Sequence, residues 1–392
     1  MKSTLISIAV ITAACFFAIS GCEETDEPIR IGATMSETGA YSTQGVAARN
    51  GYLLCEKHVN ERGGLLGRDI EFTIYDDESD SDTAIELYEQ LIVEDGVDAI
   101  MGPYGSTLTE AVAPVTEEHR MVHISPLAAT TSIWEQGREY LFMVLPPAEL
   151  FLAGLIEIAH ENDLERVAII QEDELFPSAA GDGAVEHAND LGMEVVVHET
   201  YATGTEDFTD ILQKLEDEGA EVVGMAASPL DDFIAATRQM KENDINVQMF
   251  GTSGAVDEFQ EGLGEDAEYI FGLSAWEPSV PNPGVDEFVE DYVNEFDRNP
   301  SFHAAGGYGS CQLFIEAAEN VGSIEDQDAL RDELLELETQ TVFSEYAVDE
   351  RGYQTANTGL FIQWQEGERA VVWPDELATH DYWFPMPGWD ER

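Results

Sequence analysis

Short apolar segments alternate with amphipathic ones along the first third of the chain. The apolar segments are typical of buried strands, and they span Ile29–Met35, Ile70–Tyr75, Val97–Met101 and Met121–Ile124. Between them, apolar residues recur at helical spacing over Gln44–Asn60, Thr83–Glu94 and Leu108–Glu118. Strands and helices that alternate without interruption predict a parallel sheet covered by helices on both faces.

The same alternation starts again after Pro146-Pro147. It predicts a helix over Leu150–Asn162 and then strands over Val167–Gln171, Glu194–His198, Val222–Ala226, Val247–Phe250 and Ile270–Ser274. After Trp276 and a proline-rich stretch come helices over Val285–Asp297 and His303–Asn320, short strands over Tyr346–Val348 and Leu360–Gln365, and an aromatic tail. The fold class is therefore α/β, with two doubly wound units of similar size and a cleft between them.

The first 22 residues are typical of a lipoprotein signal peptide. Lys2 precedes an apolar run, Leu5–Ile19, that is too short for an ordinary membrane span and ends in Ser20-Gly21-Cys22. A small residue before Cys predicts cleavage there and lipidation of Cys22, with residues 23–28 as a polar tether. The alternative is an uncleaved anchor with an incidental cysteine. Either way, the mature chain is expected outside the cytoplasm.

The large excess of acidic residues limits the kinds of partner that the chain can bind. The 392 residues include 80 Asp and Glu against 17 Lys and Arg, a formal charge of −63. This charge excludes nucleic acid as a partner, because phosphate contacts need basic patches. The acidic residues are spread along the whole length, which favours a halophilic source, where concentrated salt screens their repulsion. Acidity for solubility alone is the weaker alternative.

No motif for catalysis or for a cofactor is present. The chain lacks a phosphate-binding glycine loop, a dinucleotide fingerprint and a nucleophile elbow. His119 and His123 fall on different elements, which argues against a shared zinc ion, and the acidic run Asp76–Asp82 lacks the glycine of a calcium loop. Cys55 and Cys311 form no metal motif; they are small buried hydrophobic residues or one disulfide, and both alternatives stay open. We therefore expect no enzyme, no cofactor and no metal.

Two turns at the ends of neighbouring strands are candidates for ligand binding. Gly105 and Ser106 follow the third predicted strand, and the turn Ile124–Thr131 follows the fourth. In an open α/β sheet, ligands bind at the carboxyl ends of strands, and backbone N–H groups at a helix start favour a carboxylate or amide. The alternative is that Ser106 and Thr130 only cap helices.

Several motifs resemble those of the solute-binding proteins of ABC importers for branched-chain amino acids. They are "IRIGATMSETGAYSTQGVAARNGYLL", "NERGGLLGR", "IMGPYGSTLTEAVAPV", "ISPLAATTSIWEQGREYLFMVLPPA" and "VDERGYQTANTGLFIQW". The resemblance implies the type I periplasmic-binding fold, with two lobes, a three-segment hinge and a ligand enclosed by lobe closure. It places residues 29–147 and 278–342 in lobe 1, residues 148–277 and 343–374 in lobe 2, and residues 375–392 in a C-terminal tail.

The resemblance also implies a set of ligand-binding residues. In lobe 1 the matching positions are Tyr104, Gly105, Ser106, Ala128, Ala129 and Thr130, with either Ala129 or Thr130 in the role of the family's threonine. In lobe 2 they are Phe176 and Ser253. Trp276 and Tyr308 fall where related proteins have aromatic walls; the alternative for Trp276 is packing at the hinge between the lobes.

Ser253 departs from the family pattern. Leucine-binding members have a glutamate near this position that neutralises the ligand ammonium, and a buried ammonium without a carboxylate is costly. Either Asp231, Asp232 or Asp257 takes over this role, or the ligand has no ammonium. The sequence thus predicts a lipid-anchored, extracytoplasmic receptor that delivers a small amino acid or amide-like compound to the permease subunits of an ABC importer. The alternative is a ligand sensor for chemotaxis or a two-component system.

Overall fold

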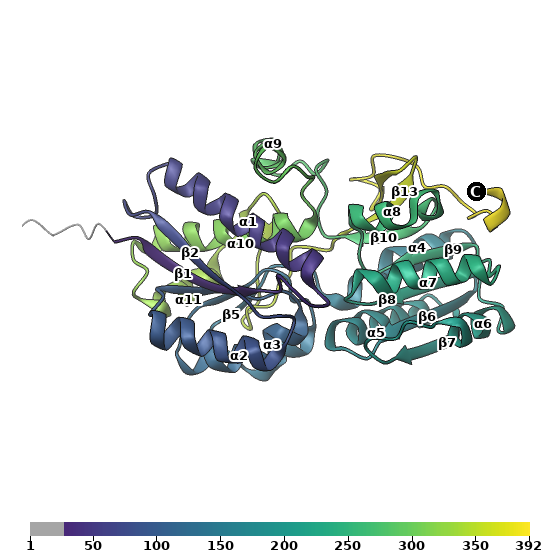
Figure 1. The fold of residues 1–392 in the computed structure, drawn as a ribbon, viewed down its shortest axis with the longest axis horizontal. Helices are drawn as coiled ribbons and strands as arrows, with labels where there is room; N and C mark the ends of the chain where they lie inside the picture. The colour runs from purple at the N-terminus through teal and green to yellow at the C-terminus, as the bar shows by residue number, and fades with distance from the viewer. Residues whose placement is uncertain (1–26) are drawn as a thin grey trace, which may run out of the picture.

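The computed structural model describes residues 27–392, and within them two separate sheets form the centres of two lobes (Figure 1). The first lobe is built on a parallel sheet with the strand order β2-β1-β3-β4-β5. Its strands are β1 (Ile29–Met35), β2 (Ile70–Asp76), β3 (Ala99–Met101), β4 (His123–Ser125) and β5 (Leu141–Met143). Its helices are α1 (Ser42–Glu61), α2 (Ser81–Glu89), α3 (Ser106–Glu118), α10 (Phe302–Val321) and α11 (Gln327–Glu336).

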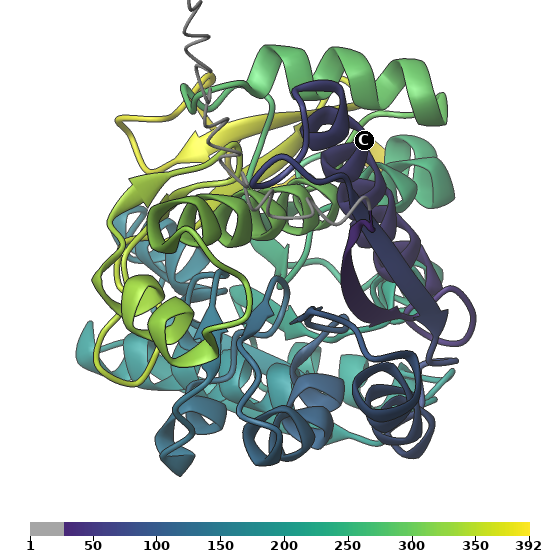
Figure 2. The ribbon, with the colours of Figure 1, turned by 90° about the vertical axis from the view of Figure 1, so that its left-hand side faces the viewer.

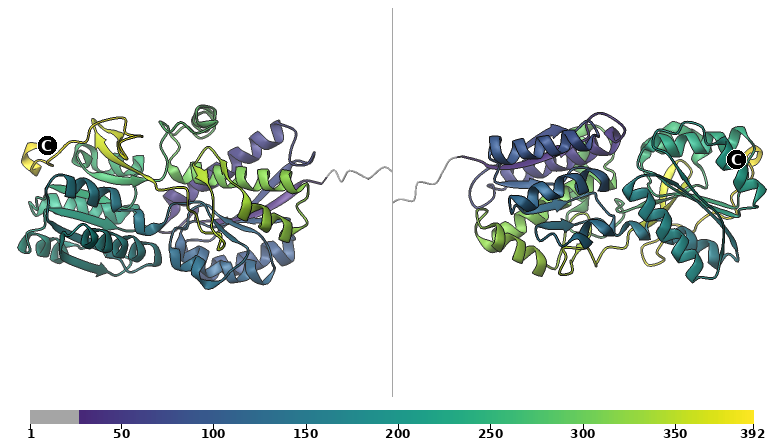
Figure 3. Two further views of the ribbon diagram at one scale, coloured as in Figure 1. Left: turned by 180° about the vertical axis from the view of Figure 1, so that it is seen from behind. Right: turned by 90° about the horizontal axis from the view of Figure 1, so that it is seen from below.

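The second lobe is built on a larger sheet with the order β14-β13-β10-β9-β8-β6-β7. Its strands are β6 (Arg166–Glu172), β7 (Glu194–Tyr201), β8 (Val222–Ala226), β9 (Met249–Thr252), β10 (Phe271–Ser274), β13 (Leu360–Gln365) and β14 (Glu368–Trp373). Its helices are α4 (Ala153–Glu161), α5 (Leu175–Asp190), α6 (Thr209–Asp217), α7 (Leu230–Glu242) and α8 (Asp257–Leu263). Helices cover both faces of this sheet, as the right-hand view of Figure 3 shows.

The second sheet has parallel strands, as predicted, and in addition an antiparallel edge. Strand β13 runs antiparallel to both β10 and β14. Strand β14, which was not predicted, forms a hairpin with β13. The two residues between them, Glu366 and Gly367, both have positive φ angles, 54° and 81°. Such a two-residue turn suits the twist of antiparallel strands, so the hairpin fixes their direction.

Three segments connect the lobes, as the resemblance implied. The chain leaves the first sheet between β5 and α4, returns between β10 and α9 (Val285–Phe296), and crosses again between β12 (Glu345–Tyr346) and β13. The two-residue strand β12 pairs with β11 (Thr339–Gln340). The predicted fold class and three-segment hinge are confirmed, whereas the exact lobe boundaries stay predictions. The C-terminal tail packs on the second lobe, where the Trp389 indole donates to the Ile245 carbonyl at 2.8 Å.

Helices α1 and α10 of the first lobe are joined by a disulfide between Cys55 and Cys311, whose Cα atoms are 6.4 Å apart. The two helices cross one another in the view of the first lobe in Figure 2. Both cysteines are buried. The structure therefore decides between the two alternatives that the sequence left open, and favours the disulfide.

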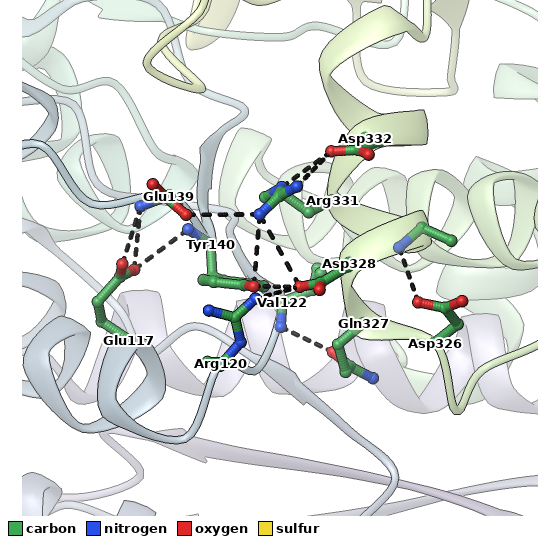
Figure 4. Close-up of polar contacts among 11 residues, drawn as sticks. Glu117, Arg120, Val122, Glu139, Tyr140, Asp326, Gln327, Asp328, Arg331 and Asp332 are labelled. Atoms are coloured by element: carbon green, nitrogen blue, oxygen red, sulfur yellow. Dashed lines mark hydrogen bonds and ion pairs between the residues drawn. The ribbon is translucent and has the colours of Figure 1, made fainter.

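A polar cluster attaches α11 to the edge of the first sheet (Figure 4). The Arg120 guanidinium donates to Asp328 at 2.7 Å, and the Tyr140 hydroxyl donates to the same carboxylate. The Val122 amide donates to the side-chain oxygen of Gln327 at 2.8 Å. The sequence analysis did not predict α11 or the short strand β5. This cluster shows how the structure holds the helix in place.

The predicted signal peptide, Cys22 and most of the predicted tether lie outside the described residues. From residue 27 onward, no helix is both long enough and apolar enough to cross a membrane.

Candidate ligand-binding site

A cavity lies between the two lobes and is lined by residues from both of them. Its lining is mostly apolar, with a few polar groups, as is usual for sites that enclose small molecules. From the first lobe the lining includes Gln44, Tyr104, Gly105, Leu127, Phe302 and His303. From the second lobe it includes Phe151, Phe176, Ser228, Leu230, Phe233, Ser253 and Val256. Lys and Arg do not occur among these lining residues.

Four of the predicted site residues line this cavity. Tyr104 and Gly105 follow β3, and Phe176 is at the start of α5, where its ring packs edge-on against Phe151 at 4.9 Å. Ser253 follows β9. Tyr104 also makes a parallel bridge with Leu127, which continues the pairing of β3 and β4 into the two turns. The structure thus brings together predicted residues from both lobes.

Ser106 lies directly beside the cavity-lining Gly105 and is almost fully buried. Its hydroxyl oxygen accepts hydrogen bonds from the backbone amides of Ala129 and Thr130, at 3.1 and 3.2 Å. The side chain of Ser106 therefore ties the two strand-end turns together. The alternative that Ser106 caps α3 is wrong, because the cap position is Gly105, with a φ angle of 81°. In the described chain no acceptor is found for the hydroxyl hydrogen of Ser106.

Thr130 and Ala128 are buried in the same turn. Thr130 precedes a short 3-10 helix, Thr131–Gln136, but its side chain makes no capping hydrogen bond. Its hydroxyl oxygen is buried and has no partner in the described residues. The alternative of a capping role for Thr130 is therefore wrong as well. Whether Ala128, Ala129 and Thr130 contact a ligand stays a prediction, since none of them lines the cavity.

Trp276 and Tyr308 are not at the cavity. The Trp276 indole donates to the Val342 carbonyl at 3.0 Å and packs against Phe288, and Tyr308 packs against the same ring. The hydroxyl of Tyr308 is 2.8 Å from the ring nitrogen Nδ1 of His58. Trp276 thus has the packing role that was its alternative. The aromatic wall is supplied instead by the rings of Phe151, Phe176, Phe233 and Phe302.

The three aspartates proposed to replace the family's glutamate are poorly placed for that role. Asp231 is exposed, and Asp257 is paired with Arg369 at 3.3 Å. Asp232 is buried, but its carboxylate already accepts a hydrogen bond from the Tyr201 hydroxyl at 2.9 Å. None of the three lines the cavity.

Glu172, the last residue of β6, was not predicted as a site residue. Its side chain has no exposed surface, and its Oε2 accepts from the Ser228 amide at 3.1 Å. Its Oε1 has no partner among the described residues. Burial raises the pKa of Glu172 to about 7 against the effect of the Ser228 amide, and the nearby Asp232 carboxylate adds to the rise. The sequence pattern that could have pointed to Glu172 is the run of three acidic residues at the end of a buried strand, Glu172 to Glu174.

The two lobes touch across the cleft. The Gln44 side chain donates to the Ser228 carbonyl at 3.0 Å, and the Thr107 hydroxyl donates to Glu174 at 2.9 Å. Both bonds join a first-lobe residue near the strand ends to the second lobe.

A family model described as "Periplasmic binding protein" matches residues 28–369. The chain belongs to this family. Its members are solute-binding receptors and not enzymes, which agrees with the sequence prediction.

Relatives of this periplasmic binding protein cover nearly its whole length. Leu/Ile/Val-binding protein homolog 1 of Brucella abortus (strain 2308) is 24% identical over 372 residues, which are 94% of this chain and 97% of that protein.

Solved structures have the same fold. A leucine binding protein, LivK, from Thermotoga maritima has a TM-score of 0.80 at 20% identity and covers 89% of this chain and 99% of its own. LivJ from Streptococcus pneumoniae, in complex with isoleucine, has a TM-score of 0.79 at 21% identity over 89% of this chain and 100% of its own. A solute binding protein from R. palustris, in complex with benzoate, has a TM-score of 0.79 at 16% identity and covers 88% of this chain and 96% of its own.

Proposed function

We propose that this periplasmic binding protein is the extracytoplasmic receptor of an ABC importer. It captures a small amino acid of the branched-chain type, or an amide-like compound, between its lobes. The observation that supports this function best is the cavity between the lobes, which combines an apolar, aromatic lining with hydrogen-bonding groups at strand ends of both sheets.

The lining of the cavity suits such a ligand. A branched aliphatic side chain would pack against the phenylalanine rings, where burial of apolar surface contributes about 25 cal/mol per Å². The polar end would meet the turn at Ser106 and the residues around Ser228. The names of the relatives point the same way, since they include Leu/Ile/Val-binding and leucine-binding proteins.

The proposal includes delivery to permease subunits and a lipid anchor on Cys22, with residues 23–28 as the tether. The disulfide in the first lobe supports an extracytoplasmic location, because such bonds persist in oxidising compartments. The alternative, a receptor for chemotaxis or a two-component system, is less favoured because the relatives with a printed role are transport proteins. The halophilic source also stays a prediction, based on the formal charge of −63.

The test is a thermal-shift screen in high salt with amino acids, amides and short-chain carboxylates, followed by calorimetric titration. Leucine, isoleucine or valine should raise the melting temperature, since a ligand at about 100 times its Kd stabilises the folded state by about 2.7 kcal/mol. A screen in which only compounds outside these classes stabilise the protein would refute the proposed ligand class.

A further inference from the structure

Glu172 does not line the cavity itself, but it is bonded to the cavity-lining Ser228, and within the described residues no Lys or Arg is paired with its buried carboxylate. Glu172 has no exposed surface, and its hydrogen-bond partner is a neutral backbone amide, that of Ser228. The residues lining the neighbouring cavity include neither Lys nor Arg. The only titratable base among them is His303, and burial lowers its pKa to about 3, so it is neutral.

Two buried oxygen acceptors near Ser228 have no donor in the described chain. They are Oε1 of Glu172 and Oε1 of Gln44. Both side chains are held by the same residue, because the Ser228 amide donates to Glu172 and the Ser228 carbonyl accepts from Gln44. Glu172 belongs to the second lobe and Gln44 to the first, so the two acceptors come close only where the lobes meet. Buried acceptors without partners are unusual, and here they come as a pair.

The opposite wall offers donors. The Ser106 hydroxyl hydrogen has no acceptor within the described residues, and Ser106 begins α3, whose N-terminal end favours negative charge. Donors on one wall and acceptors on the other match a ligand that has both a negative and a positive end.

We propose that Glu172 binds the positively charged nitrogen of the ligand, with the side-chain oxygen of Gln44 as a second acceptor when the lobes close. This inference rests on the proposed function and narrows it: the ligand class is a zwitterionic amino acid, not a simple amide or carboxylate. Glu172 thus takes the role that the sequence analysis sought in Asp231, Asp232 or Asp257. The arrangement also explains how the site can work with a serine at position 253.

The test compares leucine with 4-methylpentanoate, the same molecule without its amino group, by calorimetric titration of three proteins. These are the wild type, Glu172→Gln, and the control Asp173→Asn, which removes the same charge from the exposed neighbouring residue. Glu172→Gln should weaken leucine binding at least about 30-fold, as expected when one member of a buried charge pair is lost. Asp173→Asn should keep the affinity for leucine within about threefold. The wild type should prefer leucine to 4-methylpentanoate, and Glu172→Gln should lose most of this preference.

The outcomes separate this inference from the proposed function. If the wild type binds leucine and Glu172→Gln binds it equally well, the role of Glu172 is refuted while the proposed function stands. The same holds if the wild type binds 4-methylpentanoate as tightly as leucine. If the wild type binds neither leucine, isoleucine nor valine, the inference and the branched-chain ligand are both refuted.

The pH profile of binding gives an independent readout. A cation binds ionised Glu172, whose pKa in the empty protein is raised to about 7 by burial. The affinity for leucine should therefore fall as the pH drops from 8 to 5.5, by up to about tenfold per pH unit below 7. The charged or titratable groups that face Glu172 are Asp232 on α7, Glu174 before α5, Tyr201 on β7, and Tyr41 and Tyr104 from the first lobe. A profile that is equally steep in Glu172→Gln would assign the titration to one of these groups and overturn the proposal.

Discussion

Ser106 in the first lobe and Ser253 in the second each lie just beyond a strand of their sheet, and they differ in how they use their hydroxyl groups. Each follows a strand, and each holds the backbone of the neighbouring strand-end turn. The Ser106 oxygen accepts from two amides, at 3.1 and 3.2 Å, and no acceptor for its hydrogen is found in the described chain. The Ser253 oxygen accepts from the Ala227 amide and donates to the Ala227 carbonyl, both at 3.2 Å. Ser253 is therefore fully engaged, and Ser106 retains a donor.

This difference divides the chemistry of the site between the lobes. The first wall has a donor ready and is fixed by its own backbone bonds. In the second lobe the Ser253 hydroxyl is bonded to the backbone of Ala227. The acceptor that has no partner among the described residues is a carboxylate oxygen of Glu172. Two serines at strand ends can thus have different roles. Whether a side of the site offers a hydrogen-bond donor or an acceptor depends on which groups the neighbouring residues leave without a partner.

The first prediction tests whether the first lobe is the more firmly fixed of the two. Replacing both Cys55 and Cys311 by Ala removes a cross-link between residues 256 positions apart. The free energy of unfolding should fall by about 2–5 kcal/mol. Hydrogen exchange should locate the loss in α1 and α10, while protection in the second sheet is unchanged. Equal losses in both lobes would show that the first wall is no more rigid than the second.

The second prediction compares the two serines directly. Ser106→Ala leaves two buried amides without an acceptor, which should lower the free energy of unfolding by about 2–4 kcal/mol. It should also weaken leucine binding about 10- to 100-fold through loss of the free donor. Ser253→Ala leaves one buried amide, that of Ala227, without its acceptor, which should lower the free energy of unfolding by about 1–3 kcal/mol. The affinity for leucine should stay within about threefold of the wild-type value. Denaturant titration and calorimetry of both variants measure these values, and equal losses of affinity would contradict the division of roles.

The third prediction concerns the stability of the empty protein. Burial raises the pKa of Glu172 to about 7, above the value of an unfolded chain, so the folded state binds the extra proton. Stability from this group is therefore present at low pH and is lost as the pH rises from about 4.5 through 7. Glu172→Gln should make the ligand-free protein more stable than the wild type at pH 8, by about 1–2 kcal/mol, and not at pH 4.5. If the variant is less stable than the wild type at both pH values, Glu172 stabilises the fold and is not kept for ligand binding.

The last prediction contrasts the buried walls with the polar cluster of Figure 4. Arg331 pairs with Asp332 at 2.6 Å and lies over the Tyr140 ring at 5.3 Å, near the surface. Arg331→Met should cost at most about 1 kcal/mol at low salt, and less in molar KCl, because solvent and ions screen such pairs. Thermal melts at two salt concentrations measure this. A loss as large as that of Ser106→Ala would mean that the cluster is an integral part of the first lobe.

Much of this molecule could be predicted from local pattern. The strands β1, β8 and β13 coincide with apolar runs, and α3 and α9 follow from helical spacing. The elements that the sequence analysis did not identify are short or begin with polar residues: β5 has three residues, and β14 opens with Glu368 and Arg369. Their pairing partners, and not their own composition, make them strands. Gly105 lines the cavity, and it was predicted from its position at a strand end; Tyr104, Phe176 and Ser253, which the resemblance implied as site residues, line it too.

By itself, the sequence determined the alternation of strands and helices, hence two α/β lobes, and it determined the family through its ordered motifs. Only the tertiary structure decided which groups have partners. It paired Cys55 with Cys311, moved Trp276 and Tyr308 away from the cavity, and used Asp232 and Asp257 in other contacts. It left Glu172 buried, with one carboxylate oxygen that has no partner in the part of the chain that the structure describes. The physical reason is that periodicity reports which face of an element is buried, whereas hydrogen bonds and ion pairs depend on residues far apart in the chain that meet only when the lobes are formed.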